Sequence, residues 1–258
     1  MRMRKHFATG AALAAAAAMA LTACGGGGGT TASGTGTGTE LNVAAAYTSD
    51  DFGPLTTGAL PMGTNWQVLE GLYRLDRTDY SVSPALAAGD PVMVSDTEYE
   101  ISLRDGAKFS DGTDVTAEDV VAAFGKATAE GSIFGQFFTF IDSMEAKDTT
   151  TVTVHLKHPF ASLKERLAIL MVTPASADAA AMKSSPIGSG PYKYTEVGEQ
   201  KVVAVPNEYY NGNAPATVDT INWLPLKDDT PRLSAAYDGT VDVVESVPAS
   251  AQEDLTSK

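Results

Sequence analysis

Short stretches in which hydrophobic and polar residues alternate recur along the chain. The clearest is 99–103, where Tyr99, Ile101 and Leu103 alternate with Glu100 and a serine. Successive side chains of a strand point to opposite faces, so each such stretch predicts a strand with one buried face. Further strands are expected in these ranges: 41–45, 151–157, 192–194, 201–205, 220–224 and 241–244.

Helical spacing separates several of these strands. In 66–75, Val68 and Leu72 share one helical face before the pattern changes to alternation at Tyr73, which predicts a helix that turns into a strand. Another helix is expected after Thr116, which can cap its N-terminus. Two acids in the first turn favour the positive end of the helix dipole, and a valine and a phenylalanine four residues apart form the buried face.

A third helix is expected in the C-terminal part of the chain. It begins at Asp229, with Pro231 at its first position, and ends near Gly239. Three residues are expected to form its buried face: Leu233, Ala236 and Tyr237. The alternation of strands and helices indicates an α/β fold.

Residues 1–23 have the layout of a secretory signal. Residues 1–6 carry three fixed positive charges, and an almost wholly apolar run follows over 7–20, which is too short to span a bilayer comfortably. Residues 24–39 are rich in glycine, threonine and serine and cannot bury a core, so we expect a flexible linker. The folded body is therefore expected to begin at residue 40.

Cys24 is the only cysteine of the chain, and it follows Leu21-Thr22-Ala23. This tetrapeptide resembles the lipobox of bacterial lipoproteins, in which the cysteine becomes the lipidated first residue of the mature protein. The resemblance implies a lipid anchor at Cys24 that holds the protein to the cell membrane, on its periplasmic or cell-surface face. A lone cysteine behind an ordinary cleavage site is the alternative. In both cases the fold has no disulfide framework.

The charge of the chain excludes two classes of partner. It has 18 basic and 32 acidic residues and a formal net charge of −14. Without Arg2, Arg4 and Lys5 of the predicted signal, 15 basic residues remain against 32 acidic ones. Such a surface repels nucleic acid and anionic lipid headgroups, so neither is expected as a partner.

The stretch "IGSGPYKY", residues 187–194, could be a phosphate-binding loop or a tight turn before a strand. A dinucleotide loop needs G-x-G-x-x-G, but Pro191 directly follows the second glycine and offers no N–H to a phosphate. Two tyrosines then alternate as in a strand. We therefore expect a sharp turn in which Gly188 and Gly190 supply backbone freedom.

Other catalytic or metal-binding patterns are weak. The sequence contains neither G-x-S-x-G nor H-E-x-x-H, and His155 and His158 are expected to be two exposed histidines. Residue types alone leave a glycosidase carboxylate pair open. Four acids lack the spacing of a calcium loop and are expected to serve a turn and a helix cap: Asp111, Asp114, Glu118 and Asp119. No catalytic residue, metal or cofactor is expected.

Three separate segments carry a resemblance to a known family. Residues 99–124, "YEISLRDGAKFSDGTDVTAEDVVAAF", contain L-R-x-G-x-x-F-x-D-G followed by T-A-x-D-V. Residues 186–194 contain P-I-G-S-G-P-Y, and residues 205–244 contain N-E-Y-Y-N-G and a G-x-V-D strand. These motifs resemble those of the family 5 extracellular solute-binding proteins, the peptide- and nickel-type receptors of ABC importers. Tyr210 stands where the family usually has tryptophan.

The resemblance implies a monomeric receptor that closes two lobes on a peptide or similar small solute and delivers it to a membrane permease. Such a receptor does no chemistry on its ligand. The implied fold is a periplasmic-binding-protein-like lobe of type II, cluster C, with a mixed sheet and a smaller inserted α+β subdomain. The first lobe would comprise residues 40–75 and 181–258, and the small subdomain residues 76–180.

The resemblance also implies where a ligand binds. The cleft-lining stretch of the family corresponds to Glu245, Ser246 and Val247, and Glu245 is a candidate for a positive group such as a peptide amino terminus. Tyr47, in the loop after the first strand, is a weaker candidate. For both Glu245 and Tyr47, an ordinary solvent-facing residue is the alternative.

Members of this family normally continue through a second lobe, whereas this chain ends at Lys258. We therefore expect a fragment that lacks the second lobe and that binds peptides poorly by itself. Two other functions stay open. One is a truncated surface lipoprotein with a structural or signalling role, and the other is a secreted hydrolase.

Overall fold

The computed structural model of the chain describes residues 38–256. The predicted signal, Cys24 and nearly all of the predicted linker lie outside the described residues. Within the described part, no helix combines the length and the apolar character needed to cross a bilayer.

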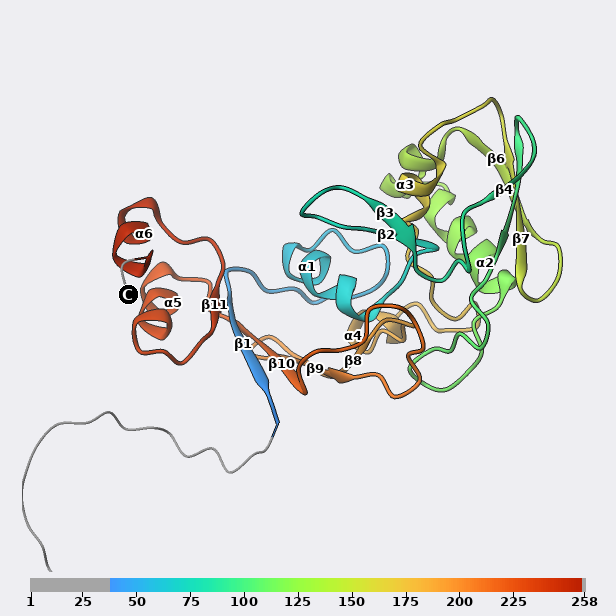
Figure 1. The fold of residues 1–258 in the computed structure, drawn as a ribbon. Helices are drawn as coiled ribbons and strands as arrows, with labels where there is room; N and C mark the ends of the chain where they lie inside the picture. The colour runs from blue at the N-terminus through green and yellow to red at the C-terminus, as the bar shows by residue number, and fades with distance from the viewer. Residues whose placement is uncertain (1–37, 257–258) are drawn as a thin grey trace, which may run out of the picture. The chain divides into compact units, whose positions relative to one another are not determined.

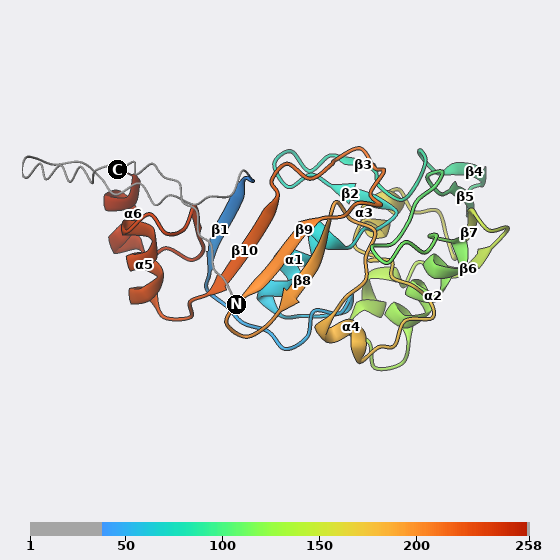
Figure 2. The ribbon, with the colours of Figure 1, turned by 90° about the horizontal axis from the view of Figure 1, so that it is seen from below.

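One of the two larger sheets is a five-stranded mixed sheet, built from the first strand and the last four strands of the described chain (Figure 2). The strand order is β11-β1-β10-β9-β8, with β1 parallel to both β10 and β11 and the other neighbours antiparallel. Every one of these strands was predicted, although β11 has only two of the four residues expected. The bounds are β1 Glu40–Ala45, β8 Tyr192–Val197, β9 Val202–Pro206, β10 Thr220–Pro225 and β11 Val243–Val244.

Helix α1, Ala59–Val68, covers one face of this sheet (Figure 1). Val43 of β1 and Trp223 of β10 point to this face and are buried with Leu60 of the helix. Burying a large apolar side chain contributes about 1.5–3 kcal/mol. The helix ends at Val68, before β2, Tyr73–Leu75, so the order of helix and strand is as predicted. The expectation that Leu72 lies on the helical face was wrong, because the chain is already extended at Leu69.

A second, antiparallel sheet has the strand order β4-β5-β7-β6. Its buried core residues lie within 72–172, whereas those of the first sheet lie within 43–69 and 192–223. The domain boundaries expected after residues 75 and 180 stay a prediction. The remaining strands and short helices are β3 Val82–Pro84, β4 Val92–Ser95, β5 Glu98–Ser102, β6 Ile141–Ala146, β7 Thr151–Leu156, η1 Ile133–Phe138, α3 Leu163–Leu167, α4 Ala181–Ser184 and α6 Ala249–Thr256.

Helix α2, Ala117–Thr128, starts as the sequence predicts. The Asp119 carboxylate accepts the Thr116 N–H at 2.8 Å, and the Thr116 side chain accepts the Asp119 N–H in return, which forms a capping box. The Thr116 hydroxyl also donates to the same carboxylate at 2.8 Å. The other carboxylate oxygen of Asp119 accepts the Ala175 N–H at 2.7 Å, so the cap also holds a loop that is distant in sequence. Val120 is fully buried on the expected face.

Helix α5, Asp229–Tyr237, corrects two expectations. Pro231 is its third residue and not its first, although Gly239, with φ +67°, ends the helix as predicted. The predicted buried face was wrong, because the buried residue is Arg232, which is 3% exposed. The residues expected to be buried are half-buried or exposed: Leu233, Ala236 and Tyr237.

Gly188 and Gly190 precede β8, as expected, but the predicted reason for them was wrong. Neither has a positive φ, so backbone freedom is not what the site requires. The chain here passes directly over the end of α1, and a methyl group on Gly188 would lie 2.1 Å from the Val68 carbonyl oxygen. The Gly190 N–H donates to that same oxygen at 2.9 Å. Close backbone approach therefore explains both glycines.

Candidate functional site

Three strand ends meet at one edge of the five-stranded sheet. Because β1 runs parallel to β10 and β11, their carboxyl ends lie side by side, with Ala45 opposite Pro225 and Ala44 opposite Val244. Open α/β sheets bind ligands outside the carboxyl ends of their parallel strands. The chain segments that leave this edge carry all four residues that the sequence singled out for ligand binding: Tyr47, Glu245, Ser246 and Val247.

Arg232 of α5 holds two of these exits together. Its guanidinium donates to the Glu245 carbonyl at 2.9 Å and to the Ser246 carbonyl at 3.1 Å, just after β11. It also donates to the Leu226 and Lys227 carbonyls at 2.7 and 3.0 Å, just after β10. These bonds give the buried guanidinium its partners. Sequence reasoning missed Arg232, because an arginine in a short helix resembles an ordinary surface residue.

Glu245 joins the end of β11 to the end of β1. Its N–H donates to the Ala44 carbonyl at 3.0 Å, and its Oε2 accepts the Ala46 N–H at 3.1 Å. Within residues 38–256 its Oε1 has no hydrogen-bond partner. The structure thus brings Glu245 and the segment that carries Tyr47 together, although they are almost 200 residues apart in sequence.

The side chains at this edge differ in accessibility. Tyr47 is 50% exposed, Ser246 is also exposed, and Val247 is half-buried. Ser246 has φ +54°, a left-handed conformation that is uncommon for residues other than glycine. Arg232, by binding the Ser246 carbonyl, helps to hold this conformation.

A hollow of about 610 Å³ lies beside these strand ends. The β1 exit contributes Thr48 to Asp50, the β10 exit contributes Leu226 to Asp228, and the turn between β8 and β9 contributes Glu199. The lining contains three exposed carboxylates and one lysine, Lys227. The lining is therefore acidic and suits a ligand that carries a positive group.

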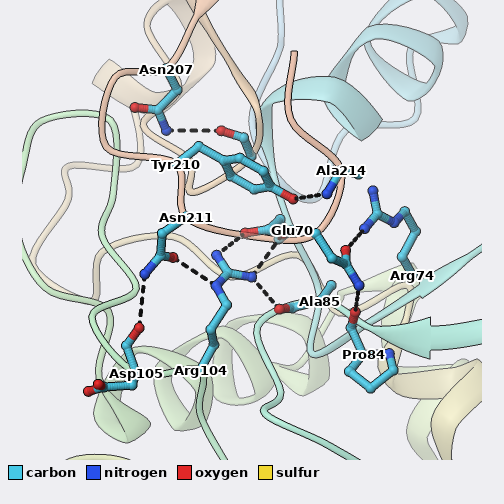
Figure 3. A network of polar contacts seen from close by, with 12 residues as sticks. Glu70, Arg74, Pro84, Ala85, Arg104, Asp105, Asn207, Tyr210, Asn211 and Ala214 are labelled. Atoms are coloured by element: carbon cyan, nitrogen blue, oxygen red, sulfur yellow. Dashed lines mark hydrogen bonds and ion pairs between the residues drawn. The ribbon is translucent and has the colours of Figure 1, made fainter. Parts of the chain in front are cut away.

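The family motifs meet in a separate network (Figure 3). Arg104, from the L-R-x-G motif, forms an ion pair with Glu70 at 3.2 Å, donates to Asn211 Oδ1 at 2.9 Å and lies over the ring of Tyr210. Asn211 also donates to the Asp105 carbonyl at 2.9 Å. Burial raises the pKa of Glu70, and the Arg104 charge opposes that rise.

This network serves positioning, because its charged groups are engaged with one another. Asn207 Nδ2 donates to the Gly190 carbonyl at 2.9 Å, and its N–H donates to the Pro191 carbonyl at 2.8 Å. The three motif segments are therefore tied to each other and to the end of α1. Glu70 was not recognised in the sequence, where it only separates a helix from a strand.

The other candidate residues have structural partners. His155 is partly buried, with Nε2 2.8 Å from Glu145 Oε1 and Nδ1 3.8 Å from Glu98 Oε2, whereas His158 is exposed as expected. Asp111 accepts the Thr113 N–H at 2.9 Å in a turn. Among residues 38–256, no group of three or more His, Cys, Asp or Glu side chains could hold a metal ion.

Comparison with known proteins identifies relatives. Residues 81–258 match a family model described as "Bacterial extracellular solute-binding proteins, family 5 Middle". The glutathione-binding protein GsiB of Escherichia coli strain K12 is 29% identical over 188 residues, which are 69% of this chain and 36% of that protein. The chain therefore spans about a third of the length of this curated relative.

Solved structures agree on the fold. DppA from Helicobacter pylori, in complex with the peptide STSA, matches with a TM-score of 0.75 at 19% identity, over 85% of this chain and 49% of that one. AgaA from A. tumefacien R10, in complex with agropinic acid, matches with a TM-score of 0.78 at 24% identity, over 85% and 46%. The described residues thus have the mixed α/β fold of a single lobe of a periplasmic binding protein. Together with the family match over most of its length, this places the chain among the family 5 bacterial extracellular solute-binding proteins.

Proposed function

We propose that this chain captures a peptide or similar small solute outside the membrane for delivery to the permease of an ABC importer. The observation that carries the proposal is the meeting of three parallel strand ends at one edge of the sheet, where the exits of β1 and β10 also line an acidic hollow. Family membership supports the same role. So do the named ligands of two relatives, glutathione for GsiB and a peptide for DppA.

Each residue at the edge has a role in this proposal. Oε1 of Glu245 accepts a hydrogen bond from the ammonium group of the ligand, while Oε2 keeps its bond to the Ala46 N–H. The exposed ring of Tyr47 packs against the ligand. Ser246 and Val247 line the same exit, where main-chain groups can bind many peptide sequences without reading their side chains.

The proposal includes a lipid anchor at Cys24, which lies outside the described residues, and a monomer on the outer face of the cell membrane. The Cys24→Ala variant is expected to leave the membrane fraction, because acyl chains supply the attachment. Ser33→Ala in the same predicted linker is the control and should stay attached. A Cys24→Ala protein that stays in the membrane fraction would contradict the anchor but not the ligand site.

We also infer that the protein releases its ligand without chemical change, because its relatives are named as binding proteins. A secreted hydrolase would instead cleave its ligand, and a purely structural lipoprotein would bind none. These alternatives give different results in one experiment.

The experiment is a titration of the ¹⁵N-labelled protein with trialanine up to millimolar concentrations, followed by NMR. Amide shifts should change for Ala46, Tyr47, Glu245 and Ser246, and mass spectrometry should recover trialanine intact. Shift changes that avoid these residues would contradict the proposed site. Release of alanine or dialanine would favour the hydrolase.

A further inference from the structure

The loop that joins β1 to α1, residues 46–58, carries Tyr47 and contributes Thr48 to Asp50 to the lining of the acidic hollow. It forms neither helix nor strand. Its path is therefore set by bonds within the loop and by contacts with the rest of the fold, and not by the ladder of a regular element. The place of Tyr47 beside the strand ends depends on those contacts.

Phe52 attaches the middle of this loop to the rest of the fold. Its side chain is fully buried, and its ring lies edge-on to the ring of Tyr194 on β8, with the ring centres 5.7 Å apart. The Phe52 N–H donates to the Lys183 carbonyl at 2.8 Å. Nδ2 of Asn65, on α1, donates to the Phe52 carbonyl at 3.0 Å and to the Gly53 carbonyl at 3.3 Å. Asn65 thus binds the loop backbone at two successive residues.

Tyr194 fixes the orientation of the buried Asn65 amide. Its hydroxyl donates to Asn65 Oδ1 at 2.9 Å and lies 2.5 Å from the hydroxyl oxygen of Thr64. Burial raises the pKa of Tyr194, so the hydroxyl keeps the proton that it donates. With Oδ1 bound to this hydroxyl, Nδ2 faces the two loop carbonyls, which can only accept. Without the hydroxyl, Asn65 Oδ1 loses its donor and the amide is free to turn away from the loop.

Short-range bonds connect Phe52 to the part of the loop that lines the hollow. The Ser49 hydroxyl accepts the Asp51 N–H at 3.1 Å and donates to the Asp51 carbonyl at 3.0 Å. Asp51 Oδ1 accepts the Gly53 N–H at 2.8 Å. Residues 49–53 are thus bonded to one another, so a shift at Phe52 and Gly53 also moves Ser49 in the lining.

We propose that Asn65 and Tyr194 are positioning residues, which set the ligand affinity by holding the loop between β1 and α1 in its binding conformation. Tyr194 acts through Asn65, and Asn65 acts through the carbonyls of Phe52 and Gly53. A loop that is already in place spares the ligand the cost of ordering it. This inference rests on the proposed function, which it deepens by naming the residues that position the ligand-binding loop.

The Tyr194→Phe variant tests the inference, because it removes the hydroxyl but keeps the ring against Phe52. Hydrogen exchange of the ligand-free protein, followed by NMR, should become about fivefold faster for amides of residues 47–57, which is the effect of losing about one hydrogen bond. The affinity for trialanine, from the NMR titration, should fall by about the same factor, because the ligand must then order the loop as it binds.

Tyr192→Phe is the matched control on the same strand. The buried Tyr192 hydroxyl accepts the N–H groups of Thr217 and Val218, both at 3.0 Å, and these lie outside the loop between β1 and α1. Urea unfolding should therefore show a loss of stability in this variant too. Its loop exchange and its affinity for trialanine should equal those of the wild type, which separates positioning of the loop from general destabilisation.

A second variant, Asn65→Ala, removes both bonds to the loop and should lower the affinity for trialanine about tenfold. The double variant Asn65→Ala/Tyr194→Phe should bind trialanine as Asn65→Ala does, because the hydroxyl acts through the amide. If the two losses add, Tyr194 does not act through Asn65 and the inference is overturned.

Loop exchange in Tyr194→Phe that is as slow as in the wild type would mean that burial of Phe52 alone holds the loop. That result, or an unchanged affinity for trialanine, would overturn the inference. The exchange needs no ligand, so the two proposals can fail separately. If the wild type does not bind trialanine while loop exchange is faster in Tyr194→Phe, the proposed function is refuted and the hold of Asn65 and Tyr194 on the loop is supported.

Discussion

Replacing Arg232 by lysine is expected to loosen the exits of β10 and β11. The guanidinium donates to four main-chain carbonyls on two chain segments, and a lysine ammonium, with three donors at one point, cannot reach both segments at once. At least two carbonyls then lose their partner. Because these bonds are partly buried and water can reach a released carbonyl, each lost bond should cost about 1 kcal/mol, so the free energy of unfolding should fall by about 2 kcal/mol.

Urea-induced unfolding of wild type and Arg232→Lys at pH 7 measures this difference. Arg77→Lys is the matched control, because Arg77 is exposed and its guanidinium carbon lies 4.6 Å from the centre of the Trp66 ring. We expect the control to change the free energy of unfolding by less than about 1 kcal/mol. Equal effects of the two substitutions would refute the assignment of Arg232 as the residue that holds the strand ends.

Two further predictions concern the scaffold. Gly188→Ala should destabilise the protein by about 3 kcal/mol or more, since the new methyl group would meet the Val68 carbonyl oxygen, whereas Gly63→Ala in α1, with no heavy atom within 4 Å, should stabilise it by about 0.5–1 kcal/mol. Thermal unfolding checks both, and tolerance of Gly188→Ala would contradict the close approach. Glu70→Gln tests the buried carboxyl. Because burial raises the pKa of Glu70, the native state holds a proton that the unfolded state releases, so wild-type stability relative to Glu70→Gln should fall as pH rises above the ordinary pKa of 4.5. Urea unfolding between pH 4 and 8 measures this difference, and a relative stability that rises with pH would mean that the attraction of Arg104 outweighs the desolvation of Glu70.

Local patterns in the sequence predict most of the regular structure. Short alternating or apolar runs identified β1, β5, β7 and β10, and Thr116 with Asp119 identified the start of α2. Such signals depend only on neighbours in the chain. The expectation of one buried face was wrong for β1, β7 and β10, where three consecutive residues are buried and both faces are therefore covered. The ends of the strands were predicted less well: β11 comprises only Val243–Val244, although a strand was expected over 241–244.

Features that depend on contacts between distant parts of the chain could not be predicted from the sequence. Arg232 is buried because residues on two other segments present carbonyls to it, and Gly188 is required because the end of α1, about 120 residues earlier, passes beside it. The bond between Glu245 and the Ala46 N–H needs the parallel register of β1 and β11, which no local pattern contains. The resemblance to a family supplied Glu245 and Tyr47 as candidates, and only the fold brings their segments together.

The most direct test of peptide capture at the strand ends compares trialanine with N-acetyl-trialanine in wild type and Glu245→Gln. Glutamine keeps an oxygen for the Ala46 N–H but loses the charge that would bind an ammonium group. NMR titration should give an affinity for trialanine about tenfold lower in the variant, and an affinity for the acetylated peptide that does not change. If trialanine binds wild type and Glu245→Gln equally well, Glu245 does not bind the amino terminus of the ligand, and the proposed site is contradicted.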